Sequence, residues 1–520
     1  MYSPAKSPHS IWARDAISDW PALAMDLTVD VCVVGAGIAG LSTAYHLHSI
    51  GKSVAVLDAG DLTSGESMRT SAHLACVADD RFINLERTHG GDGARLFAES
   101  HAAAIDRIEL ITRQQHIECD FKRVDGYLFQ PADEASTDFL EHEMAAAQRA
   151  GLAPESLLES PPAIGFDIGP CLRFPNQAQF NPMKYLSGLA KYLQANGVLI
   201  HGHTRVVEVQ GGDQAYVKTE KGQRVSCAQV VVATNTPFNN RYVIHTKQAA
   251  YRTYVVAFTI PVNTIETALY WDTVDPYHYV RLVKNEHGPD STELLIVGGE
   301  DHRTGQEDDP AGRFARLESW TRRRFPLAGK VAYHWSGQVL EPVDGVAFIG
   351  RNPLDEDNIY IATGDSGMGL THGTIAGMLI ADLIAEKENP WAKLYDPSRK
   401  SLGSIGEYAR ENFNTAVQYT DWLTGSDVDE LEKIEPGSGA VVRKGMTKVA
   451  VHRDEAGNFH QCSAVCPHLG GIVAWNDVEK SWDCPCHGSR FDADGTRICG
   501  PAVSSLKQTD AIELPVLVGA

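Results

Sequence analysis

A glycine-rich stretch near the N-terminus constrains the fold more than any other feature of the sequence. In VCVVGAGIAG, Gly35, Ala36, Gly37 and Gly40 follow four apolar residues and precede a helix-like segment. Gly35 allows a tight turn, Gly37 and its neighbour Ala36 bring the backbone close to a pyrophosphate, and Gly40 lets helix and strand pack closely. Asp58 ends the next strand, where a carboxylate can accept hydrogen bonds from ribose hydroxyls. The pattern predicts an α/β, Rossmann-like domain that binds a dinucleotide.

Length and charge limit what else the chain does. At about 100 to 200 residues per domain, 520 residues require more than one core. The net charge of -21 disfavours nucleic acid as a partner because it repels phosphate. The sequence has no secretion signal and no apolar run of about 18 residues, so we predict a cytoplasmic protein without a membrane span.

A second constraint lies near the C-terminus. The segments CPHLGG and CPCHGSRF supply Cys466, His468, Cys484 and His487 as candidate metal ligands. A Rieske [2Fe-2S] centre uses this set, with two thiolates on one iron and two imidazoles on the other. A Cys2His2 zinc site is the alternative, but the spacing of the first pair is too tight for it.

The pattern of elements divides the chain in two. Strand-like and helix-like segments mix over residues 1–423, which we expect to form the dinucleotide-binding part and a mixed-sheet substrate part, interleaved. A polar, acidic stretch at 424–436 is expected to be a linker. Short β-like runs separated by turns over 437–520 predict a small all-β domain.

The dinucleotide itself is suggested by a resemblance. The N-terminal SIWARDAISDWPALAMDLTVDVCVVGAGIAGLSTAYHL, the strand VVVATNTP, and the segments HWSGQVLEPVDGVAFIGR and IYIATGDSGMGLTHGTIAG resemble FAD-dependent amine and amino-acid oxidoreductases of the D-amino-acid oxidase, glycine oxidase and sarcosine oxidase family. The resemblance covers roughly residues 10 to 390. It implies FAD as the cofactor.

The same resemblance implies which residues contact FAD. They lie on four segments far apart in the sequence. The implied contacts are Arg69, Thr70, Ser71 and Ala72 along the isoalloxazine, the Val206 backbone at the adenine, Ala233 and Thr234 beside the dinucleotide, and Gly364, Gly367, Met368, Gly369, Leu370 and Thr371 at the helix start near the pyrimidine edge of the flavin.

Three residues are candidates for substrate chemistry. Tyr279 and Arg281 alternate onto one face of a predicted strand, where Arg281 could bind a substrate carboxylate and Tyr279 could add a hydroxyl. His73, on the loop expected along the flavin, could act as a base toward an amine. Hydride transfer to a flavin needs no obligatory protein base, so the absence of a catalytic triad does not argue against activity.

The C-terminal region, roughly 437–520, resembles a Rieske domain, including the Gly500–Ala502 turn that matches the loop covering the cluster. The resemblance implies that Ser489 donates a hydrogen bond to a cluster sulfur. Rieske proteins of respiratory chains have a cysteine where this chain has Gly471. Cys486 is therefore expected to be a free, buried thiol.

Together these features predict a flavoenzyme that oxidises the C–N bond of an amine or N-alkyl amino acid and passes electrons singly from FAD to the fused cluster, then to an unidentified acceptor. The single dinucleotide fingerprint favours reduction by an organic substrate over reduction by NAD(P)H. Two alternatives stay open. One is a non-catalytic redox or electron-transfer flavoprotein, and the other is a Rieske oxygenase, which the C-terminal place of the metal box disfavours.

Overall fold

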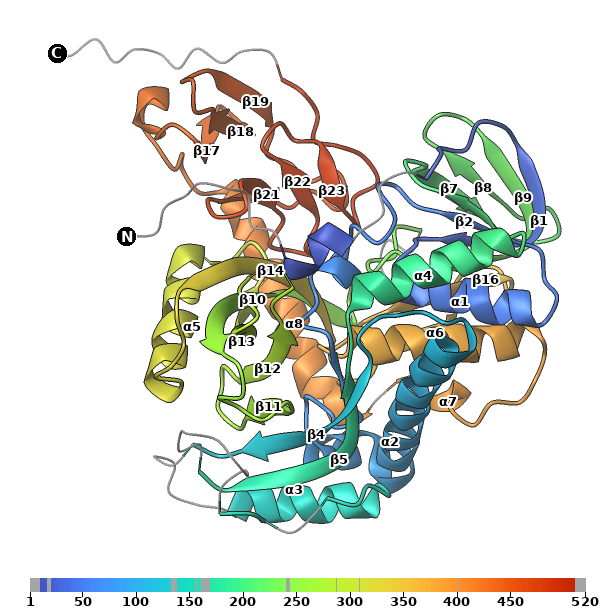
Figure 1. Ribbon diagram of the computed structural model, residues 1–520. Helices are drawn as coiled ribbons and strands as arrows, with labels where there is room; N and C mark the ends of the chain where they lie inside the picture. The colour runs from blue at the N-terminus through green and yellow to red at the C-terminus, as the bar shows by residue number, and fades with distance from the viewer. Residues whose placement is uncertain are drawn as a thin grey trace.

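The computed structural model describes residues 10–15, 20–131, 138–154, 157–159, 169–239, 244–286, 288–307, 309–400 and 402–509. The N-terminal domain is built on two large sheets, and two small sheets form a C-terminal domain that lies against it (Figure 1). This arrangement confirms the expected α/β fold with a mixed sheet and a separate all-β domain.

The first large sheet carries the glycine-rich turn. Its eight strands include the path β15-β16-β9-β1-β2-β6, with β7 and β8 attached beside β9. In β1, Val31 and Val33 pack into one core while Cys32 and Val34 pack into another on the opposite face. The strand can be apolar throughout because both faces are covered. The strands are β1 (Leu27–Val34), β2 (Val54–Leu57), β6 (Leu199–His201), β7 (Val206–Gln210), β8 (Tyr216–Thr219), β9 (Arg224–Val232), β15 (Phe348–Arg351) and β16 (Ile359–Thr363).

The second large sheet carries the predicted substrate strand. Its order is β14-β10-β13-β12-β11-β4-β5-β3, and most neighbouring strands are antiparallel. Only β11 and β4 pair in parallel. The strands are β3 (His73–Leu74), β4 (Lys122–Phe129), β5 (Cys171–Gln179), β10 (Gln248–Pro261), β11 (Leu269–Asp272), β12 (His278–Lys284), β13 (Thr292–Arg303) and β14 (Val331–Pro342).

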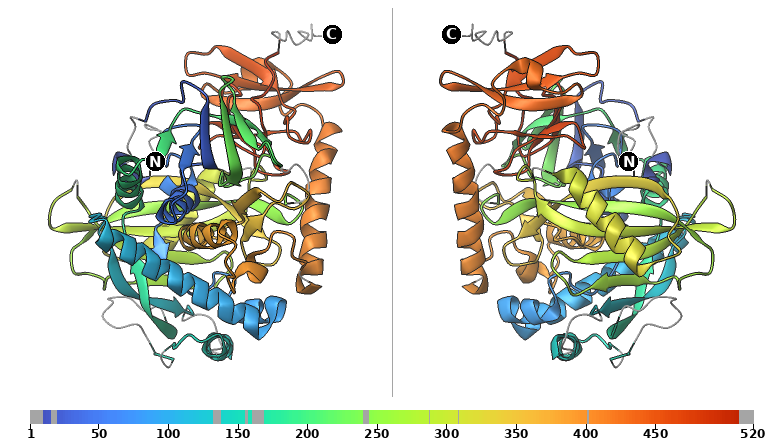
Figure 2. Two further views of the ribbon diagram at one scale, coloured as in Figure 1. Left: turned by 90° about the vertical axis from the view of Figure 1, so that its right-hand side faces the viewer. Right: turned by 90° about the vertical axis from the view of Figure 1, so that its left-hand side faces the viewer.

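Helices cover the two sheets and connect the domains. In the N-terminal domain α1 packs on α6, α6 on α2, and α5 covers β10 and β13. Helix α8 runs along one side of the N-terminal domain up to the C-terminal domain (Figure 2). The helices are α1 (Ile38–Ser49), α2 (Phe82–Gln114), α3 (Asp138–Arg149), α4 (Pro182–Ala195), α5 (Pro310–Arg324), α6 (Gly369–Ile384), α7 (Ala392–Tyr395) and α8 (Ile405–Gln418).

The C-terminal domain consists of a three-stranded and a four-stranded antiparallel sheet. The segment 424–436, expected as a linker, packs against it: Leu431 and Ile434 are buried with Val442, and the Val441 amide donates to Asp427. The strands are β17 (Ser438–Lys444), β18 (Thr447–Arg453), β19 (Phe459–Ser463), β20 (Ala474–Asn476), β21 (Ser481–Asp483), β22 (Arg490–Asp492) and β23 (Arg497–Cys499).

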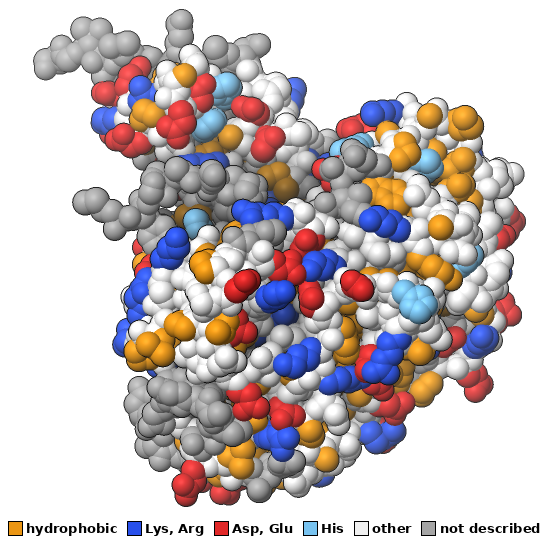
Figure 3. Space-filling view, viewed as in Figure 1, with side chains coloured by type: hydrophobic (Ala, Val, Ile, Leu, Met, Phe, Trp, Pro, Cys, Tyr) orange, Lys and Arg blue, Asp and Glu red, His pale blue; other side chains and the backbone are white. Residues whose placement is uncertain are grey.

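On the face drawn in Figure 3, Lys and Arg side chains lie among Asp and Glu side chains. Within the described ranges, no helix combines the length and the hydropathy that a membrane span requires.

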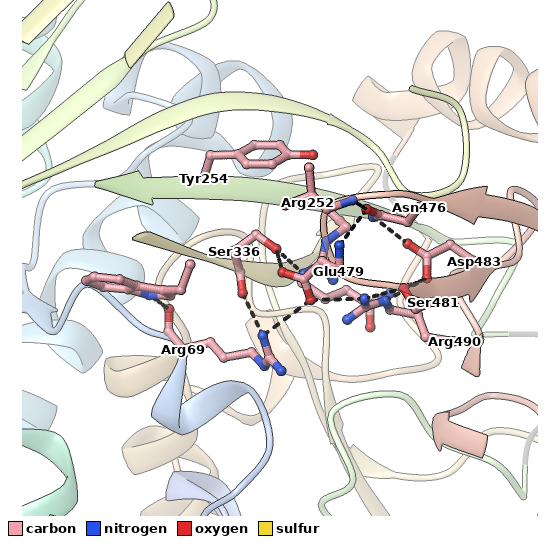
Figure 4. Close-up of polar contacts among 12 residues, drawn as sticks. Arg69, Arg252, Tyr254, Ser336, Asn476, Glu479, Ser481, Asp483 and Arg490 are labelled. Carbon is pink, nitrogen blue, oxygen red and sulfur yellow. Dashed lines mark hydrogen bonds and ion pairs between the residues drawn. The ribbon is translucent and has the colours of Figure 1, made fainter. Parts of the chain in front are cut away.

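A buried charge cluster joins the two domains (Figure 4). Glu479, on the β20–β21 hairpin, lies 3.3 Å from a guanidinium nitrogen of Arg252, 3.1 Å from one of Arg490 and 3.6 Å from one of Arg69. Its carboxylate also accepts a hydrogen bond of 2.5 Å from the Ser336 hydroxyl. Burial alone would raise the pKa of Glu479, but the three arginines outweigh it and hold that pKa well below its usual range.

We predict that Glu479→Gln destabilises the protein by about 3–5 kcal/mol, since it leaves the buried Arg252 guanidinium without its ion-pair partner. Asp477→Asn on the same hairpin is the control, because the Asp477 side chain is 61% exposed and its ion pair with Lys480 contributes about 0–1 kcal/mol. Chemical unfolding of the cofactor-loaded protein measures both variants. Equal losses of unfolding free energy in Glu479→Gln and Asp477→Asn would contradict the role assigned to Glu479 as a buried counter-charge.

Candidate functional site

A cavity of about 460 Å³ lies where the two large sheets and the C-terminal domain meet. At one end it is lined by the glycine-rich turn and Asp58, and elsewhere by His73 and Tyr279 of the second sheet. Arg490 of the C-terminal domain also lines it. The cavity therefore joins the parts of the chain that the sequence singled out for dinucleotide binding and for substrate chemistry.

The geometry of the glycine turn fits a dinucleotide. Gly35 has φ +105°, and a Cβ there would lie 2.3 Å from the Ala233 carbonyl oxygen. A Cβ on Gly40 would lie 1.8 Å from the Gly35 carbonyl oxygen. Only glycine fits either position, and the resulting turn leads directly into the N-terminus of α1, where backbone N–H groups attract a phosphate.

Asp58 stabilises the turn and also faces the cavity. One carboxylate oxygen accepts from the Ala36 amide at 2.7 Å, and the other accepts from the Gly60 amide at 3.0 Å. Each oxygen has a further lone pair that a ribose hydroxyl could use. The predicted role of Asp58 is compatible with these contacts, which the sequence pattern alone did not reveal.

Most of the other predicted FAD contacts lie at the cavity wall. Ala36, Gly40, Ala72 and Gly364 lie behind the wall rather than on it. Those that line the cavity are Gly35, Gly37, Asp58, Arg69, Thr70, Ser71, Val206, Ala233, Thr234, Gly367, Met368, Gly369, Leu370 and Thr371. The residues that are present fit FAD, and their individual contacts stay predictions.

His73 and Tyr279 lie side by side at the cavity wall, with ring centroids 5.5 Å apart. The His73 Nδ1 is 3.0 Å from the Ser71 hydroxyl, and the Tyr279 hydroxyl is 3.0 Å from that of Thr253. Burial lowers the pKa of His73 to about 3, and the charge of Arg281 adds to the effect. The imidazole is therefore neutral at pH 7, and a pKa this low makes it a hydrogen-bonding group rather than a base.

Arg281 is not among the cavity-lining residues. Its guanidinium is buried and donates to the backbone carbonyls of Ser71, Ala72 and Phe180. The alternation of β12 puts Arg281 on the same face as Tyr279, but Ser71 and Ala72, which lead into β3, lie against the guanidinium, and Ser71 is the residue that reaches the cavity wall. The arrangement makes Arg281 a support for that segment and leaves no guanidinium fork there for a substrate carboxylate.

Carboxylates occupy the cavity near Tyr279 instead. Asp79, Asp365 and Tyr277 line this part of the wall. Burial raises the pKa of Asp79 to about 7, against the opposing charge of Arg81, and raises that of Asp365 to about 6. Sequence reasoning missed both acids: no motif marks Asp79, and Asp365 lies between the predicted FAD contacts Gly364 and Gly367 without having been singled out.

The two metal-box loops form matching turns. In the first, the Cys466 amide donates to the Gly471 carbonyl at 2.8 Å. In the second, the Cys484 amide donates to the Ser489 carbonyl at 2.8 Å. Cys466 and Cys484 are 1% and 2% exposed. Paired turns of this kind present both thiols to one space that water does not reach.

The histidines of the two loops also meet. The ring centroids of His468 and His487 lie 4.9 Å apart. Burial lowers the pKa of His487 to about 3, and the neighbouring His468 adds to this, so the ring is neutral and can bind a metal. The Ala502 amide donates to the Ser489 hydroxyl, which joins the Gly500–Ala502 turn to the second loop.

The four predicted metal ligands fall into two pairs. The Cys466 and Cys484 thiols are both buried, and the rings of His468 and His487 lie side by side. A Rieske cluster needs only two protein ligands on each iron, which is what the two loops offer.

The cysteines outside the ligand set are free. A Cβ on Gly471 would lie 2.5 Å from the Cys486 sulfur, so this glycine occupies the place from which a disulfide partner would reach Cys486. Cys462 is buried in the core of the C-terminal domain. Cys499 lines the large cavity, a position that its sequence context does not indicate.

Aromatic residues near the metal loops were also missed from the sequence. The Tyr419 hydroxyl donates to the Leu469 carbonyl at 3.0 Å, and the Trp422 indole donates to the Gly470 carbonyl at 2.9 Å. Both precede the region expected to be the C-terminal domain. The sequence changes from a helical to a polar pattern at this point, and neither pattern predicts that Tyr419 and Trp422 pack onto the first metal loop.

Comparison with known proteins agrees with both halves of the site. The model of the FAD dependent oxidoreductase family matches residues 30–383, and that of the Rieske [2Fe-2S] domain matches residues 422–510. The Bacillus subtilis protein YhfW, by its name a Rieske 2Fe-2S iron-sulfur protein, is 30% identical over 97% of this chain and 98% of its own length.

Two further similarities concern the N-terminal domain. The gamma-glutamylputrescine oxidoreductase of Escherichia coli is 28% identical, over 71% of this chain and 87% of its own. A glycine oxidase from Geobacillus kaustophilus has the same fold, with a TM-score of 0.59 and 17% identity over 72% of this chain and 99% of its own. The chain belongs to the FAD-dependent oxidoreductase family and carries a C-terminal Rieske [2Fe-2S] domain.

Proposed function

We propose that this enzyme oxidises the C–N bond of a small cationic amine and delivers the electrons singly through its Rieske centre to an external acceptor. Bound FAD supplies the two-electron chemistry, because it can take a hydride from carbon and release electrons one at a time. The protein binds the amine, selects its charge state and holds the two redox sites together.

The charges on the cavity wall favour an amine over an amino acid. A substrate carboxylate needs a guanidinium or similar donor, and Arg281 is committed to backbone carbonyls. Arg69 lines the cavity but is engaged by the Ser336 carbonyl and by Glu479. Asp79, in contrast, presents a carboxylate to the cavity, where it would attract an ammonium group.

The same acid can prepare the amine for reaction. A hydride leaves the carbon beside nitrogen only when the amine is neutral, so the bound ammonium has to lose a proton. Asp79, with its pKa raised to about 7, is a group at the wall that could accept it, whereas the pKa of about 3 makes the His73 ring a weak base. The name of the Escherichia coli relative, which specifies an amine, also supports this substrate class.

The observation that carries the electron route is the position of Gln338. Gln338 lines the FAD cavity, and its side-chain amide donates to the Gly488 carbonyl at 2.8 Å, next to the ligand His487. His245 of the N-terminal domain adds a second contact, with its ring centroid 4.9 Å from that of His468 and 5.9 Å from that of His487. The metal histidines thus face the flavin-binding domain, and the covalent connection keeps the two sites at high effective concentration.

The first prediction concerns Asp79. In Asp79→Asn we expect kcat/KM for an amine to fall by about tenfold to a hundredfold above pH 7, the loss of one charge-assisted contact. Because Asp79 is protonated below its pKa of about 7, wild type and variant should converge as the pH falls toward 5. Steady-state assays from pH 5 to 9 measure the ratio of kcat/KM in the wild type to kcat/KM in the variant.

The matched control for this experiment is Asp92→Asn, whose side chain is 96% exposed and should leave the ratio at one. Protonation of the substrate changes kcat/KM of both proteins equally, so it cancels when the value for the wild type is divided by that for the variant. A ratio for Asp79→Asn that stays constant across this pH range would count against the proposed role of the carboxylate.

The second prediction separates the two half-reactions. Cys484→Ser removes a metal ligand, while the flavin-binding domain keeps its own cores. Anaerobic amine should still bleach the flavin at near wild-type rate, but turnover with a one-electron acceptor should fall steeply. Stopped-flow absorbance measures flavin bleaching, and steady-state assays measure turnover with the acceptor.

Cys486→Ser is the control, since Cys486 is the neighbouring buried thiol outside the ligand set and its variant should keep the cluster. Unchanged acceptor turnover in Cys484→Ser would mean that the cluster does not lie on the route. Failure of any amine to bleach the flavin, even in the wild type, would favour the redox-sensor alternative.

A further inference from the structure

The FAD cavity has one wall that does not belong to the FAD-dependent oxidoreductase family match. This wall comes from β22, β23 and the residue that follows β23. It consists of Arg490, Arg497, Ile498, Cys499 and Gly500. The matched family region ends at residue 383, so nothing in that family model assigns these residues to cofactor binding.

Direct contacts hold this wall in place. The Arg205 guanidinium donates to the Arg497 carbonyl at 3.5 Å. A Cβ added to Gly500 would lie 3.6 Å from the Thr236 carbonyl oxygen, so the two chains approach closely there. The Cys499 thiol lies 3.6 Å from the side-chain oxygen of Gln338. The wall therefore touches the N-terminal domain at several points along the cavity.

The position of the wall indicates which part of FAD it would meet. Arg205 lies next to Val206, where the adenine is expected, and its charge acts on Asp58, the predicted ribose ligand. Arg497 is paired with Arg205 through its carbonyl. The Arg497 end of the C-terminal wall consequently faces the adenosine and phosphate half of the cavity, while Cys499 lies beside Gln338.

The charge on this wall suits a dinucleotide. Arg497 is 8% exposed, and its guanidinium donates to the Ala502 carbonyl, which orients it. Burial lowers the pKa of Arg497 to about 10, and the nearby charge of Arg205 adds to the effect while Glu220 opposes it. Two guanidinium groups held close together at a cavity are stabilised by an anion placed between them.

We propose that the Rieske domain completes the FAD site, with β23 and Gly500 covering the adenosine half of the cofactor and Arg497 adding positive charge for its pyrophosphate. FAD bound in this cavity would be enclosed by both domains. Loading and release of FAD would then require the C-terminal wall to move. This inference concerns cofactor binding and does not depend on the proposed electron route.

A charge pair at Ile498 tests the proposal with little risk to folding, because Ile498 lines the cavity and is 46% exposed. Ile498→Glu should bind FAD about fivefold more weakly than wild type, the effect of one like-charge interaction at close range in water. Ile498→Lys should bind at least as tightly as wild type. The measurement is FAD titration of the full-length, cluster-containing apoflavoprotein, followed by flavin fluorescence.

Lys444→Glu is the control for a change of charge elsewhere in the same domain, since Lys444 is exposed on β17, and it should leave the affinity unchanged. The visible spectrum of the cluster shows whether each variant retains a folded Rieske domain. Equal affinities for Ile498→Glu and Ile498→Lys would overturn the proposal.

A second measurement needs no variant. Adding FAD to the full-length, cluster-containing apoflavoprotein should slow amide hydrogen exchange in peptides that cover residues 497–500, because the cofactor fills the space they line. Peptides that cover β17 should not change. Unchanged exchange in residues 497–500 would show that the Rieske domain is only a neighbour of the site, even if the electron route is correct.

Discussion

The carboxylate of Glu479 is the interaction on which the arrangement of this enzyme depends. A single buried negative charge on the C-terminal hairpin meets Arg252 of the second sheet and Arg69 of the loop at the FAD cavity. The same carboxylate meets Arg490, the residue directly after Ser489 at the second metal loop. This one carboxylate therefore holds the metal loops, the segment with Arg69 and the second large sheet in fixed positions relative to one another. As a result, residues of the C-terminal domain lie at the wall of the cavity.

The cavity has a positively charged end and a negatively charged part. Arg205 and Arg497 line one end, next to the glycine turn, and suit the phosphates of FAD. Asp79 lines the part of the cavity near Tyr279 and suits a cation. Opposite charges in one continuous cavity would allow FAD and the proposed cationic substrate to bind side by side without competing for the same groups.

Local motifs allowed the two-domain fold, the dinucleotide-binding turn and the metal loops to be predicted from the sequence. The glycine turn and the two metal loops are short segments whose backbone geometry depends on their own residues, as the positions of Gly35 and Cys466 show. The predicted role of Arg281 did not follow from its pattern, because strand alternation gives the face of a side chain and not the segment packed over it. Glu479 and Asp79 carry no motif, and their roles arise only when distant segments meet.

We propose that electrons from an amine reach the cluster within one chain. The most direct test is electron paramagnetic resonance of the wild-type enzyme, frozen at intervals after anaerobic mixing with an amine that bleaches the flavin. The account predicts that the signal of a reduced [2Fe-2S] cluster grows after the flavin absorbance falls, at a rate independent of protein concentration. A cluster that stays oxidised beside a fully bleached flavin, or one that is reduced only in proportion to protein concentration, would contradict it.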